Sequence, residues 1–130
     1  MGGELSKAMH LKTFEQNGRV IALIDSDQPL ITDAASALGL LADVRYETGA
    51  DRIALNRQAL SESFFILSTC LAGEVLQKFI NYHAKLAVYG DFSEYTSKPL
   101  RDFIRESNRG NDIFFTATAD EAVKRLAGVQ

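Results

Sequence analysis

The sequence of 130 residues is poor in the side chains that build disulfides and soft metal sites: it has one cysteine and two histidines. A single cysteine excludes an internal disulfide and a thiolate cluster, and so few cysteines are typical of proteins in a reducing cytoplasm. His10 and His83 lie far apart in the chain, so the spacing of a histidine metal site is absent. We therefore expect no metal site of these kinds and no cofactor.

Positive charge and long apolar runs are also scarce. Lys and Arg total 14 against 17 Asp and Glu, which gives a net charge of −3, whereas nucleic-acid binders normally show a basic excess. No apolar run reaches the ~18 residues of a membrane span, and the N-terminus lacks the apolar core of a signal peptide. The expected partners therefore include neither nucleic acid nor membrane, and the expected location is the cytoplasm.

Hydrophobic residues make up 46% of the chain, enough for one globular domain over 1–130 with a flexible N-terminus of about eight residues. Strand-like and helix-like stretches alternate, and the Asn17-Gly18 pair predicts a tight hairpin turn. The predicted strands cover 10–15, 20–24, 52–55, 86–89 and 113–116, and the predicted helices begin near 32, 68, 97 and 118. The fold class is α/β in the order β-β-α-β-α-β-α-β-α: a small open mixed sheet whose first strand is antiparallel at or near an edge.

Side-chain spacing also predicts what is buried. Thr32 is the expected N-cap of the first helix, and Cys70 is expected to be a small buried hydrophobe, the more common role of a free cysteine. The first helix should bury a face made of Ala34, Ala35, Leu38, Leu41 and Ala42.

Three stretches of this chain, Leu67–Phe79, Tyr89–Ser93 and Arg101–Gly110, resemble the bacterial family called domain of unknown function 4180. The resemblance runs from about Val20 to Leu126, and family members usually have glycine where this chain has Cys70. It implies an α/β fold and a bacterial cytoplasmic protein. The family has no established activity.

The order of elements is also similar to that of STAS domains, the fold of the anti-sigma factor antagonists. Those domains carry a phosphorylatable serine at the start of the helix after the third strand, in an Asp-Ser-Ser-Gly-like turn. Ser68 and Thr69 fall at that place, although Leu67 and Cys70 stand where the Asp and Gly would be. The two hydroxyls are candidates for a phospho-acceptor or anion site, or for plain N-caps of the helix.

Two further groups are candidate binding residues. Asp25, Asp27, Asp91 and Ser93 follow predicted parallel strands at the sheet edge where ligands bind in open α/β folds, unless they are only solvated loop residues. Around the third helix, Arg101, Arg105, Asn108 and Arg109 form a basic and polar cluster suited to phosphate or carboxylate, unless it is only a solvated face. No catalytic residue is assigned.

These patterns favour a non-enzymatic regulatory or protein-interaction module of STAS-like architecture. The alternative is a small-molecule- or metal-dependent enzyme or sensor at the acidic strand-end edge. A protein partner is expected, though the residues do not identify it. The pairs Phe64-Phe65 and Phe114-Phe115 are expected to lie in the core or at an interface, and an outward ring in each pair would favour self-association. From these aromatic pairs and the modest net charge of −3 we expect a dimer or weaker self-association.

Overall fold

The computed structural model describes residues 9–129, so the N-terminal segment predicted to be flexible lies outside the described residues. The predicted order of strands and helices is confirmed, with three short 3-10 helices between the third strand and the second α-helix. In chain order the elements are β1 (Met9–Gln16), β2 (Arg19–Ser26), α1 (Ala34–Thr48), β3 (Arg52–Asn56), η1 (Arg57–Ala59), η2 (Glu62–Phe65), η3 (Leu67–Thr69), α2 (Leu71–Asn81), β4 (Lys85–Tyr89), α3 (Lys98–Arg109), β5 (Ile113–Thr116) and α4 (Ala119–Gly128).

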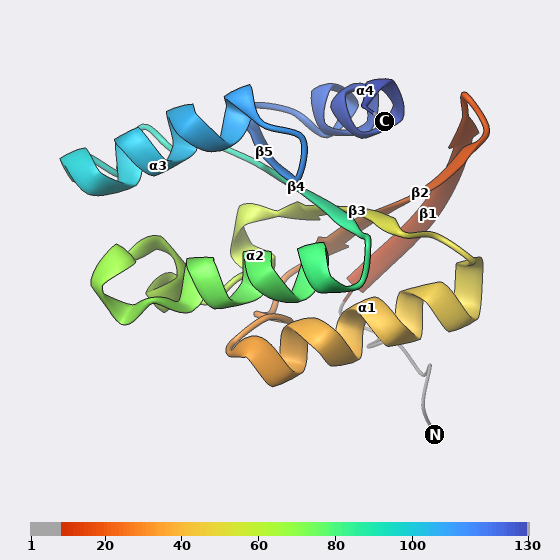
Figure 1. Cartoon of the computed structure of the whole chain (residues 1–130), viewed down its shortest axis with the longest axis horizontal. Helices are drawn as coiled ribbons and strands as arrows, with labels where there is room; N and C mark the ends of the chain where they lie inside the picture. The colour runs from red at the N-terminus through yellow and green to blue at the C-terminus, as the bar shows by residue number, and fades with distance from the viewer. Residues whose placement is uncertain (1–8, 130) are drawn as a thin grey trace.

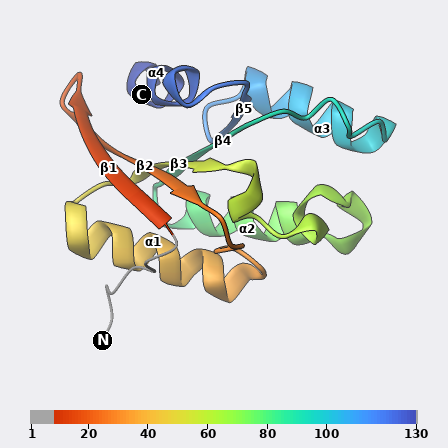
Figure 2. The same cartoon turned by 180° about the vertical axis from the view of Figure 1, so that it is seen from behind.

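The five strands form one open sheet in the order β1-β2-β3-β4-β5. β1 and β2 are antiparallel and are joined by Asn17 and Gly18, both at positive φ (55° and 76°), as a tight two-residue turn requires. β2 to β5 pair in parallel, so β1 is the antiparallel edge strand that the sequence predicts. Figure 2 shows β1 along one side of the molecule and α3 at the other.

The helices cover the two faces of the sheet unequally. Each crossover from β2 to β5 steps to the next strand in the same direction, and crossovers of one hand then place their helices on one face. Accordingly α1, α2 and α3 contribute to one large apolar core, whereas the buried residues of α4 belong to a second core on the opposite face. Figure 1 shows α1 and α2 below the central strands and α4 above them. Within residues 9–129, no helix is long and apolar enough to cross a membrane.

The first helix begins one residue later than predicted. Its N-cap is Asp33, whose carboxylate accepts the Ser36 N–H at 2.7 Å, while the Ser36 hydroxyl accepts the backbone N–H of Asp33 in return. This bond to the Ser36 N–H lowers the pKa of Asp33. The expected apolar face is also wrong apart from Leu41, because α1 buries Ala37, Leu40, Leu41 and Val44.

Six aromatic rings gather where η2, α3 and β5 meet. Phe64, Phe65, Phe92, Tyr95, Phe103 and Phe115 form a chain of ring contacts with centroids 4.8–6.4 Å apart. Both predicted pairs, Phe64-Phe65 and Phe114-Phe115, are buried and no ring of either points outward. These aromatic pairs therefore offer no outward ring to favour self-association, and the dimer stays a prediction.

Candidate functional site

The largest concentration of predicted site residues lies beside α3. A hollow of about 770 Å³ separates this helix from the loop that connects β4 to α3, and we call it the α3 hollow. It is lined by Phe92, Ser93, Tyr95, Thr96, Arg101, Ile104, Arg105, Asn108 and Arg109. The structure thus brings all four members of the predicted basic cluster together with Ser93.

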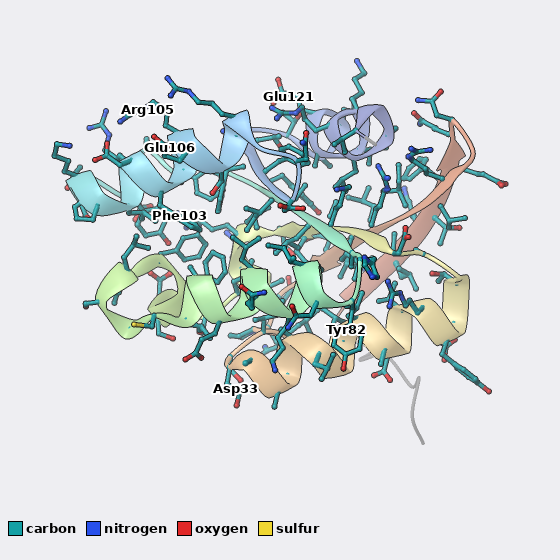
Figure 3. All side chains as sticks on the ribbon, viewed as in Figure 1. Asp33, Tyr82, Phe103, Arg105, Glu106 and Glu121 are labelled. Carbon is teal, nitrogen blue, oxygen red and sulfur yellow. The ribbon has the colours of Figure 1, made fainter. Side chains whose placement is uncertain are left out.

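The sequence of α3 places its arginines on one face. Ser97 caps the helix by accepting the Leu100 N–H at 3.3 Å, and Pro99 occupies the first turn, where its missing N–H costs nothing. Positions 101, 105 and 109 then recur every four residues, close to one helical turn. Figure 3 shows Phe103 pointing from α3 toward α2, whereas Arg105 lies on the outer side of the helix.

The three arginines differ in how far their charge is neutralised. Arg105 Nη2 contacts Asp102 Oδ1, and Lys98 Nζ lies 2.7 Å from the other carboxylate oxygen of Asp102. The hydrogen bonds from Lys98 and Arg105 lower the pKa of Asp102. Within residues 9–129, the guanidinium groups of Arg101 and Arg109 form no hydrogen bond or ion pair, so these exposed groups remain available to an anion.

The side chain of Asn108 forms hydrogen bonds to β5 that the sequence did not predict. Its side-chain carbonyl accepts the Phe115 N–H at 2.8 Å, and its amide nitrogen donates to the Phe115 carbonyl at 3.2 Å. These bonds satisfy the outer edge of β5, which has a neighbouring strand only on its β4 side. The amide group is therefore committed to the sheet, although Asn108 lines the hollow.

The loop after β4 forms the wall of the α3 hollow opposite the helix, and Arg57 fixes the position of this loop. Arg57 Nη1 donates to the Asp91 carbonyl at 2.9 Å, and its guanidinium carbon lies 5.4 Å from the centre of the Tyr95 ring. Gly90 has a φ of 147°, and a Cβ there would lie 3.1 Å from Arg57 Cβ, so the close approach requires glycine. The Asp91 carboxylate accepts the Ser93 N–H at 2.9 Å, and this bond lowers the pKa of Asp91.

Aromatic and apolar groups form the remainder of the α3 hollow. Tyr95 stacks on Phe65 with centroids 4.8 Å apart, and Phe92 meets Phe115 edge-to-face at 5.6 Å. Tyr95 also donates its hydroxyl to Glu62, 3.2 Å away. Sequence reasoning missed Arg57 and Tyr95 as residues of this site. Ile104 lies within the Arg101–Gly110 motif, and the Tyr89–Ser93 motif covers the start of the loop after β4, but neither motif indicated the hollow between them.

The acidic candidates differ in their surroundings. Asp25 lines another hollow, of about 410 Å³, together with His10 and Tyr89, and Asp27 is exposed. Burial, assisted by the charge of Asp25, raises the pKa of Tyr89 to about 12. In the part of the chain that the structure describes, no three His, Cys, Asp or Glu side chains are grouped to hold a metal ion. The enzyme or sensor alternative for this edge stays a prediction.

Ser68 and Thr69 do not occupy the first turn or cap of α2, because they lie in η3 just before it. The N-cap is Cys70, which is exposed and not buried as expected, since its left-handed backbone (φ 66°) turns the chain between η3 and α2. The Thr69 hydroxyl lies 2.7 Å from the Ser63 carbonyl and accepts the Leu71 N–H at 3.3 Å. One hydroxyl thus faces a free N–H of the helix, as predicted, and a regulatory role for either residue stays a prediction.

Fold and site together define an α/β domain with an open mixed sheet and an arginine-lined hollow at one edge. The chain belongs to the family described as Domain of unknown function (DUF4180), whose model matches residues 16–126. This match confirms the family resemblance seen in the sequence. Comparison with curated proteins and with solved structures gives no match.

Proposed function

We propose that the protein is a non-enzymatic interaction module of STAS-like architecture that acts in regulation by binding a protein partner. The α3 hollow is the binding site in this proposal. It holds an anionic side chain of the partner against the arginines of α3, and the cytoplasm is the compartment where this takes place.

One observation carries the proposal. The guanidinium groups of Arg101 and Arg109 have no partner in the described part of the chain, although the protein is acidic overall and has 17 acidic residues. Their guanidinium groups border a hollow that also has aromatic and aliphatic walls. Such a mixture of charge and apolar surface suits a protein segment, because binding sites for side chains combine apolar area with a few placed polar groups.

Site-specific photo-crosslinking in the native cells tests this proposal. A benzophenone amino acid at Thr96, on the rim of the α3 hollow, should form an adduct with a partner protein. The matched control places the same amino acid at Tyr46, which is 84% exposed on α1 and outside the hollow.

The adduct should disappear when Arg101→Glu and Arg109→Glu are introduced together, because both charges that attract the partner are reversed. Lys12→Glu on β1, at the other edge of the sheet, should leave it intact. An adduct at Thr96 that survives the double substitution, or one that forms equally at Tyr46, would contradict the proposal.

A further inference from the structure

The α3 hollow presents its residues in a regular row along the helix. Arg101, Ile104, Arg105, Asn108 and Arg109 all line it, at the i, i+3, i+4, i+7, i+8 spacing of one helix face. With a rise of 1.5 Å per residue, the backbones of Arg101 and Arg109 lie about 12 Å apart along the axis. Ile104 lies between them.

The charges along this row make two attachment points. Arg105, in the middle, is already bound to Asp102, and Asn108 is committed to β5. The two unpaired guanidinium groups are therefore the outer ones, Arg101 and Arg109. Between them the hollow offers apolar surface from Ile104 and from Phe92 across the hollow.

An extended peptide matches this arrangement in length and in direction. Side chains i, i+2 and i+4 of an extended segment point to the same side, and i to i+4 spans about 13 Å at 3.3 Å per residue. We infer that the partner contributes an extended segment of the pattern acid-x-apolar-x-acid, an inference that rests on the proposed function. Its two carboxylates pair with Arg101 and Arg109, and its central apolar side chain packs on Ile104 and Phe92.

A single-stranded nucleic acid fits the hollow less well, although it too is an extended anion. Its bases bind by stacking on free aromatic faces. Tyr95 already stacks on Phe65 and has the Arg57 guanidinium over its ring, and Phe92 already contacts three other rings. The net charge of −3 further opposes a polyanion.

Fluorescence anisotropy with synthetic peptides tests the pattern. The first peptide has nine residues, with aspartate at its third and seventh positions, leucine at its fifth and serine or threonine elsewhere. The second has the same composition with the aspartates at its third and sixth positions, so that the acidic side chains point to opposite sides. We expect the first peptide to bind about tenfold more tightly than the second, because only it can form both ion pairs at once.

Variants of the full chain assign the contacts. Arg101→Glu and Arg109→Glu should each weaken binding of the first peptide about tenfold, and Lys12→Glu should leave it unchanged. If both peptides bind equally and both are weakened by the arginine variants, the pattern is wrong while the proposed function survives. If neither peptide binds, or if an oligothymidine of matched charge binds more tightly, the inference is overturned, and the crosslinking at Thr96 then decides the proposed function separately.

Discussion

Replacing Cys70 by glycine should stabilise the protein, because this residue adopts a conformation that suits glycine. Its φ of 66° and ψ of 5° lie in the left-handed region, which costs a residue with a Cβ about 1–2 kcal/mol. Glycine avoids that cost but adds about 0.5–1 kcal/mol of conformational freedom to the unfolded chain. The thiol contributes little, since it is exposed and its hydrogen bond to the Ser68 carbonyl is weak, with the two atoms 3.9 Å apart. The midpoints of these two ranges give a net gain of about 0.75 kcal/mol.

Urea unfolding of Cys70→Gly and Cys70→Ala measures this gain. Alanine removes the thiol but keeps the Cβ, so its stability should stay within about 0.5 kcal/mol of the wild type. Gly39→Ala provides the converse comparison, because Gly39 lies within α1 and a Cβ there would meet nothing within 4 Å. That change should also stabilise, by about 0.5–1 kcal/mol. A Cys70→Gly variant no more stable than Cys70→Ala would refute the reasoning.

Three other predictions each concern one side chain. The folded state raises the pKa of Tyr89 to about 12 and so favours the neutral phenol; the stability that this shift contributes is complete below pH 10 and is lost as the pH rises toward 12. Tyr89→Phe should lack this alkaline loss of stability when unfolding is measured against pH. Identical curves for the variant and the wild type would contradict this prediction. Asn108→Ala should cost about 1–2 kcal/mol in urea unfolding because both bonds to Phe115 disappear, and a wild-type value would show that water replaces them without loss. The lowered pKa of Asp33 stabilises the folded protein at any pH above the pKa of this residue in the unfolded chain, and the stabilisation is lost as the pH falls through its pKa in the folded state. The melting temperature of Asp33→Ala should therefore fall less steeply in acid than that of the wild type.

The strands, helices and their order could be predicted because their signals are local. The turn at Asn17 and Gly18, the cap at Ser97 and the cap at Thr118 each act within a few residues, and all three are present in the structure. The apolar run of β2 is buried on both faces, with Ile21 in one core and Ile24 in the other. A local pattern failed where it was ambiguous: α1 is rich in alanine and leucine all around, so the face it buries was decided by its contacts with the sheet and α2.

The candidate site was predictable only in part. The spacing of Arg101, Arg105 and Arg109 along the chain already places them on one helix face. What lies opposite them was not predictable, because the loop after β4 is held by residues far away in the sequence. Arg57 binds the carbonyl of residue 91, and the ring of residue 65 stacks on that of residue 95.

The sequence by itself therefore determined the class of fold, the elements and the arginine row, since periodicity, turns and caps depend on neighbours within a few positions. Only the tertiary structure decided which of those arginines are free, that the Asn108 amide serves β5, and that Cys70 is exposed in a left-handed turn. Each of these outcomes depends on the groups that packing brings together in space, and residues distant along the chain supply many of them.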